Sequence, residues 1–110
     1  MSVETRSTLP LSETKLQGQV RKYLSRLKSC WHYRANDSWR AGIPDLIGCY
    51  YGYFFAIELK VQDKKPTAIQ EITLEEIINH GGGEACVARS LKEVKKFMEV
   101  LHARHLERQP

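Results

Sequence analysis

Two apolar segments that meet at a Tyr-Gly pair constrain the fold of this chain more than any other feature of its sequence. Residues 42–60 read GIPDLIGCYYGYFFAIELK. The segments 44–50 and 53–61 each have the composition of a strand, and Tyr51-Gly52 between them predicts a hairpin with a two-residue turn. Both faces of this hairpin are apolar, which is typical of a sheet that is covered on both sides.

Three charged residues interrupt the apolar hairpin, and the expected register brings them together. With the turn at Tyr51-Gly52, Asp45 lies directly opposite Glu58. Cross-strand partners share a face of the sheet, with Cβ atoms about 5 Å apart. Lys60 shares that face with Glu58 because side chains alternate along a strand with a period of two. The sequence therefore predicts a charged cluster at one end of one face.

Two carboxylates held side by side predict a bound cation. They repel each other, so one stays protonated unless a cation joins them. A hard divalent ion with oxygen ligands and retained waters meets this need. Taken singly, each charge also has a structural explanation, since Glu-x-Lys is common and an Asp after Pro often ends a turn. Pro44-Asp45 and Glu58-x-Lys60 in register across one hairpin form a more specific pattern, and they predict a functional metal site.

The remaining segments predict one α/β domain. The expected elements, in order, are a helix from Ser12 to about Lys28, strands over 31–36, 44–50 and 53–61, a helix from Thr67 to the glycines at 81–83, a strand over 84–88 and a helix capped by Ser90. This α-β-β-β-α-β order with a C-terminal helix indicates a mixed central sheet flanked by helices. We expect residues 1–11 to be a flexible arm, residues 12–104 to be the domain and residues 105–110 to be a tail.

Length and composition narrow the class of protein. A chain of 110 residues suits one domain with its own core. Three cysteines without a Cys-x-x-Cys pair argue against a disulfide framework or a structural zinc site. The absence of an apolar run of about 20 residues and of a signal peptide predicts a soluble, cytoplasmic protein without membrane contact. The net charge of +4 permits a nucleic-acid partner without requiring one.

The charged cluster and its surroundings resemble a known family of nucleases. Pro44-Asp45 with Glu58-Leu59-Lys60 resembles the PD-(D/E)xK signature, and the element order is similar to the restriction-endonuclease-like core of that superfamily. The segments GIPDLIG, AIELK, PTAIQ and GGGEACVARS resemble the VRR-NUC family in particular, over about residues 12–98. That family includes small stand-alone proteins of bacteria and phages. Its members often have a glycine in the loop after the lysine, where this chain has Gln62-Asp63-Lys64-Lys65.

The resemblance implies a set of site residues. Asp45, Glu58 and the Leu59 carbonyl would hold Mg²⁺ or Mn²⁺, and Glu13 would touch the metal or its water. Lys60 would act on the attacking water and on the phosphate, and Gln70 matches the glutamine of the family's second helix. For Glu13 the alternative is a favourable charge at a helix N-terminus. For Gln70 the alternative is a buried side-chain hydrogen bond.

Basic residues around this cluster are candidates for contacts with DNA phosphates, although each is also explained as a solvated surface charge. The candidates near the site are Arg34, Arg40, Lys64, Lys65 and Arg89. Further basic residues mark the outer sides of the first helix (Arg21, Lys22, Arg26, Lys28) and the last helix (Lys92, Lys95, Lys96). These two sets either extend a DNA track or keep the protein soluble.

These observations lead to a functional hypothesis. We expect a divalent-metal-dependent DNA endonuclease that acts on branched DNA, in particular four-way (Holliday) junctions, as a homodimer in the cytoplasm of a bacterium or a phage-infected bacterial host. The aromatic residues Trp31, Tyr33, Tyr50, Tyr51 and Tyr53 are candidates for the dimer interface. The alternatives are a monomeric nuclease for flaps, forks or nicks, an RNA-cleaving member of the superfamily, and a DNA-binding module with an inactive site.

Overall fold

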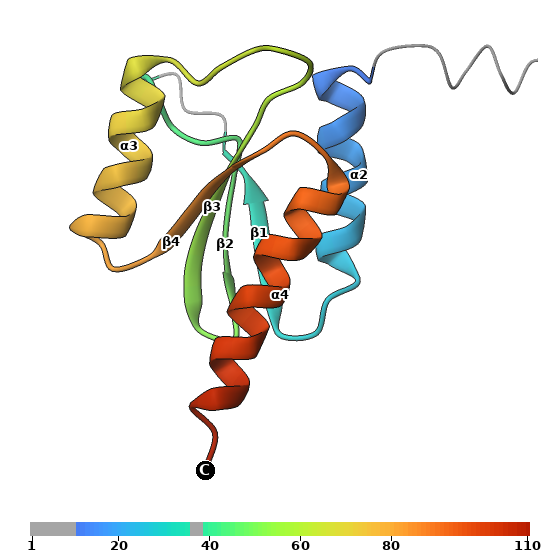
Figure 1. Cartoon of the computed structure of the whole chain (residues 1–110), viewed down its shortest axis with the longest axis vertical. Coiled ribbons are helices and arrows are strands. Elements are labelled where there is room, and N and C mark those ends of the chain that lie inside the picture. The colour runs from blue at the N-terminus through green and yellow to red at the C-terminus, as the bar shows by residue number, and fades with distance from the viewer. Residues whose placement is uncertain (1–10, 36–38) are drawn as a thin grey trace, which may run out of the picture.

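A four-stranded mixed sheet with helices on both sides forms the body of the protein (Figure 1). The computed structural model describes residues 11–35 and 39–110. The elements in chain order are α2 (Glu13–Ser25), β1 (Cys30–Arg34), β2 (Leu46–Tyr50), β3 (Tyr53–Leu59), α3 (Ala68–Asn79), β4 (Glu84–Ala88) and α4 (Leu91–Glu107). This confirms the expected restriction-endonuclease-like α-β-β-β-α-β order with a C-terminal helix. No helix within the described ranges is long and apolar enough to cross a membrane.

The register of the central hairpin agrees with the sequence-based expectation. The strand order is β1-β2-β3-β4, with β3 and β4 parallel and the other pairs antiparallel. Tyr50 pairs with Tyr53 and Leu46 pairs with Ile57. Tyr51 and Gly52 have φ angles of 51° and 87°, as a primed hairpin turn requires at both central positions. Asp45, which directly precedes β2, therefore comes opposite Glu58.

Different helices pack against the two faces of the sheet. Phe55, Ile57 and Leu59 point into the main core, where α2 and α4 supply most of the partners. The buried residues of those two helices are Leu16, Val20, Leu24, Val94, Met98 and Leu101. On the other side α3 packs against β4 (Figure 1). The side chains of Glu58 and Lys60 alternate with those of the core residues, so they belong to the α3 side of the sheet.

Each helix begins at a capping residue that the sequence indicated. Ser12 accepts a hydrogen bond from the Lys15 amide, and Ser90 accepts one from the Glu93 amide. Thr67 begins α3 as the N-cap of a capping box. Helix α2 ends at Ser25 rather than near Lys28, and the chain then turns through Ser29, which has a φ of 59°.

The ends of the domain differ in detail from the expected boundaries. Residues 1–10 of the expected arm lie outside the described residues, whereas Leu11 packs against the core. Helix α4 continues to Glu107, so the expected boundary at residue 104 falls inside it. The His105 ring stacks on Tyr51 with a centroid distance of 4.0 Å. The last helix is therefore tied to the hairpin turn beyond the point where we expected a tail.

Candidate functional site

Asp45 is held in place from two directions. Its Oδ2 accepts a hydrogen bond of 2.7 Å from the backbone amide of Leu59, and its Oδ1 accepts one of 3.4 Å from Nε2 of Gln17. Its backbone carbonyl accepts a bond from the amide of Ala35. Strand β3 and helix α2 together therefore fix the carboxylate at the end of the sheet.

The loop before Asp45 explains why this segment begins with glycine. Gly42 has a φ of 85°, in the left-handed region that favours glycine. A Cβ atom at this position would lie 2.8 Å from the carbonyl oxygen of Ile69. The loop consequently lies directly against α3. Next to this close approach, the buried Pro44 lines a hollow between α3 and the sheet, directly before Asp45.

Glu58 is a buried acid with one oxygen left unsatisfied. The residue is 2% exposed, and its Oε2 lies 3.4 Å from Nζ of Lys60. In the ionised form its Oε1 is buried and has no hydrogen-bond partner within the described residues, whereas the protonated form can donate to Asp45. A buried polar atom without a partner is costly, and natural proteins contain few of them. The oxygen is thus positioned to accept a further ligand.

The charge state of Glu58 reflects this environment. Burial raises its pKa most, the nearby Asp45 carboxylate raises it further, and Lys60 partly offsets both, which brings the pKa to about 7. Without a further cation, the Glu58 carboxyl is therefore about half protonated at neutral pH. A divalent cation between the two acids would stabilise both in the charged form.

The donor set fits magnesium or manganese better than zinc. In the described part of the chain no group of three His, Cys, Asp or Glu side chains could hold a metal ion. The candidate ligands are therefore the carboxylate of Asp45, the carboxylate of Glu58 with its unsatisfied Oε1, and the carbonyl oxygen of Leu59. Mg²⁺ typically binds through one or two carboxylates and completes its shell with water and substrate phosphates. Zinc sites are built from at least three protein ligands.

Helix α2 contributes a residue that the sequence analysis did not single out. Gln17, rather than Glu13, contacts Asp45. Glu13 is partly buried in the first turn of the same helix, one turn before Gln17. Its expected contact with a metal or a metal-bound water stays a prediction. The position of Gln17 next to Leu16, at the border of the buried stripe, was the signal that could have identified it.

Gln70 has a structural role in a helix cap, which differs from the buried hydrogen bond that we considered as its alternative because these bonds are exposed. Its Oε1 accepts a hydrogen bond of 2.9 Å from the amide of Thr67, and its own amide donates to Thr67 Oγ1 at 3.3 Å. This capping box begins helix α3. This capping box does not use the side-chain nitrogen of Gln70, which would be the group that donates to a phosphate or a water. A role of Gln70 at the site therefore stays a prediction.

Arg89 shapes the loop that follows Lys60. Its Nη1 donates to the carbonyl oxygens of Gln62 at 3.0 Å and of Lys64 at 2.6 Å. Gln62 in this loop has a φ of 54°, in the left-handed region that favours glycine. The guanidinium therefore holds a strained turn in the loop that carries the exposed Lys64 and Lys65.

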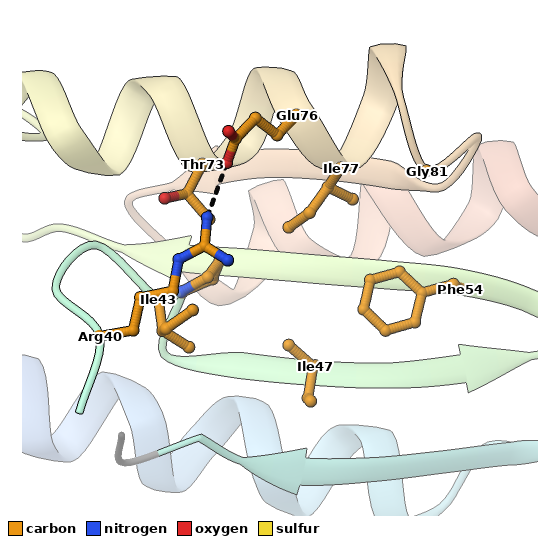
Figure 2. A pocket seen from close by; sticks show the side chains of 9 residues that line it. Arg40, Ile43, Ile47, Phe54, Thr73, Glu76, Ile77 and Gly81 are labelled. Carbon is orange, nitrogen blue, oxygen red and sulfur yellow. Dashed lines mark hydrogen bonds and ion pairs between the residues drawn. The ribbon is translucent and has the colours of Figure 1, made fainter. Parts of the chain in front are cut away.

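Arg40 forms the rim of a pocket that none of Asp45, Glu58 and Lys60 lines. Its Nη2 lies 2.7 Å from Oε1 of Glu76, an ion pair that bridges the loop before Asp45 and helix α3 (Figure 2). The pocket has a volume of about 360 Å³ and an apolar interior in which Ile77 of α3 faces Ile47 and Phe54 of the sheet (Figure 2). Of the other expected DNA contacts, Arg34, Lys64 and Lys65 are exposed and have no ion pair with a described residue.

Comparisons with known proteins give one informative match. No family model matches the chain, and no curated protein matches it. A solved structure described as a VRR_NUC domain is similar to this chain with a TM-score of 0.68 and 25% sequence identity. The match covers 79% of this chain and 94% of that one.

Proposed function

We propose that this chain, which has the VRR-NUC family fold, is a divalent-metal-dependent DNA endonuclease that hydrolyses phosphodiester bonds. The observation that carries the proposal is the buried Glu58, whose unsatisfied Oε1 lies in the same cluster as Asp45 and Lys60. An inactive DNA-binding module would have no need of such a costly arrangement. The complete acid-acid-lysine set therefore favours an enzyme over a binding module.

Each side chain has a role in the proposed reaction. Asp45 and Glu58, with the Leu59 carbonyl, would hold Mg²⁺ or Mn²⁺, while the Leu59 amide and Gln17 keep Asp45 oriented. When bound, the ion polarises the phosphodiester and lowers the pKa of water. The Lys60 ammonium would donate to the attacking water or to a phosphate oxygen and stabilise the negative charge that develops there. Gln70 and Glu13 would orient the water or the phosphate from the two flanking helices.

The preferred substrate in this proposal is a four-way DNA junction cut by a homodimer. Such a junction has approximate two-fold symmetry, and two sites related by a dyad would cut opposed strands. The interface would lie on β1, where Trp31 and Tyr33 are 61% and 57% exposed and stack with a centroid distance of 6.1 Å. The other aromatic candidates are less suitable, because Tyr50 is buried and Tyr51 stacks on His105.

We expect the four-way junction to be cut faster than a matched duplex, fork or flap in Mg²⁺ or Mn²⁺. A cruciform plasmid should yield linear product, because a dimer makes paired incisions, and light scattering at micromolar concentration should give the mass of a dimer. Tyr33→Ala should shift the protein toward monomer. Val100→Ala, at an exposed position on α4, serves as the matched control and should not.

The possible outcomes separate the parts of the proposal. A monomer that only nicks the plasmid would leave a nuclease for flaps, forks or nicks and remove the junction-resolving role. If the protein cuts only the equivalent RNA substrates, it is an RNA nuclease and not a DNA nuclease. If none of the four DNA substrates is cut with either ion, the nuclease proposal itself is wrong.

A further inference from the structure

A groove between helices α2 and α4 gathers basic side chains far apart in the sequence. It has a volume of about 190 Å³ and is lined by Gln19, Lys22, Tyr23, Arg26, Leu91 and Lys95. A second hollow on α4 adjoins it through Lys95 and is lined also by Lys92, Lys96 and Glu99. We call the surface formed by Lys22, Arg26, Lys92, Lys95 and Lys96 the basic groove. Two cations of the basic set on the first helix thus form one continuous surface with the basic set on the last helix.

The charge of the basic groove is largely uncompensated. The ion pairs between described residues involve Lys60, Arg40 and Arg104, and none involves a cation of the groove. Glu99 is the one carboxylate among the residues that line the two hollows. Nζ of Lys95 lies 5.5 Å from the centroid of the Tyr23 ring, a cation–π contact that holds this ammonium over the groove. Such a concentration of like charge attracts a polyanion.

The groove lies on the side of α2 that faces away from the acid pair. Successive residues of an α-helix are about 100° apart around the axis, so Lys22 and Arg26 are rotated by about 140° and about 180° from Gln17. Gln17 contacts Asp45, and the helix between these two sides is about 10 Å thick with its side chains. A straight duplex whose phosphate reaches Asp45 therefore does not also fill the groove.

We infer that the basic groove binds the phosphate backbone of a second DNA segment, an arm of a branched substrate other than the one that is cut. This inference rests on the proposed DNA-cleaving function and gives it a source of selectivity for branched DNA. Lysine and arginine contacts to phosphates carry no sequence information, but they fix the orientation of a bound duplex. An enzyme with one small domain would then recognise a branch point by contacting two of its arms at once.

Charge removal in the groove tests this inference. The variant Lys22→Gln/Lys95→Gln removes one cation from each wall. Lys28→Gln/Arg108→Gln removes the same charge at exposed positions that line neither hollow, so Lys28 is here a solvated surface charge and not part of the basic groove. Binding to a four-way junction and to a linear duplex of equal length is measured in Ca²⁺ over a range of salt concentrations. We expect the groove variant to bind the junction on the order of 10-fold more weakly near 0.1 M salt, with a salt slope smaller by about 2. Linear duplex binding should change little, and the control variant should bind both DNAs like the wild type.

Other outcomes would overturn the inference. If the groove variant binds both DNAs like the control variant, the groove is only a solvated surface. If it loses the same affinity for linear duplex as for the junction, the groove belongs to a single track and not to a second arm. Circular dichroism verifies that all variants are folded. The binding measurement does not depend on cleavage. If the groove variant gives the expected binding result but the protein cuts no DNA, this inference stands and the proposed nuclease function is wrong.

Discussion

Replacing Lys60 with alanine should reduce the rate of DNA cleavage on the order of 10³-fold. The side chain is the cation closest to Glu58, and its ammonium would stabilise charge that develops only in the transition state. Asp45→Ala and Glu58→Ala should have effects at least as large, because each removes a ligand of the divalent ion. Single-turnover cleavage at saturating enzyme separates this loss of rate from any loss of affinity.

DNA binding by the three variants should largely survive, since most phosphate contacts would come from basic residues outside the acid pair. Lys28→Ala is the matched control for Lys60→Ala, because it removes one positive charge at an exposed position outside the site. A Lys60→Ala protein that cuts at the wild-type rate would show that the Glu-x-Lys assignment is wrong.

Glu58→Gln should stabilise the metal-free protein at alkaline pH while it abolishes cleavage. The folded-state pKa of Glu58 is about 7, above its ordinary value of 4.5, so the folded protein binds this proton more tightly than the unfolded chain does. The free energy of unfolding therefore falls as the pH rises from about 4.5 to about 7. Glutamine has no such proton, so the variant should gain on the order of 2 kcal/mol at pH 8 and almost nothing below pH 4.

Urea denaturation in EDTA at several pH values measures this gain. Glu99→Gln, an exposed substitution on α4, is the matched control and should change the free energy of unfolding little at any pH. An unchanged or lower stability of Glu58→Gln at pH 8 would contradict the view that the acid pair is strained without its ion. Lost activity combined with increased stability is the pattern expected of residues that serve function at the expense of the fold.

The parts of the structure that could be predicted depend on local patterns. Tyr51-Gly52 fixed the hairpin turn, and the alternation of side chains then placed Asp45 opposite Glu58 without any tertiary information. The helix starts followed from Ser12, Thr67 and Ser90 as capping residues. The predicted end of α2 near Lys28 was wrong. The helix ends at Ser25, because the chain turns into β1 through Ser29.

The parts that could not be predicted depend on how distant elements pack. Gln17 reaches Asp45 only because α2 lies across the end of the sheet, and spacing alone does not indicate which side chain of a helix will make such a contact. The sequence predicted Arg89 as a phosphate contact, which stays a prediction, but it did not indicate that Arg89 holds the loop after Lys60. The basic groove was present in the sequence as two separate sets of cations, and only the packing of α2 against α4 joins them.

Metal-dependent cleavage tests the central claim most directly. Wild-type protein freed of metal with EDTA is incubated with a labelled four-way junction and a linear duplex, before and after Mg²⁺ or Mn²⁺ is added in excess, beside Lys60→Ala prepared in the same way. The account predicts no cleavage in EDTA and full recovery with either ion for the wild type. Lys60→Ala should recover only a rate on the order of 10³-fold lower, because cleavage requires both the ion on the acid pair and the Lys60 ammonium beside it. Robust cleavage by the wild type in EDTA, or equal recovery by Lys60→Ala, would contradict it.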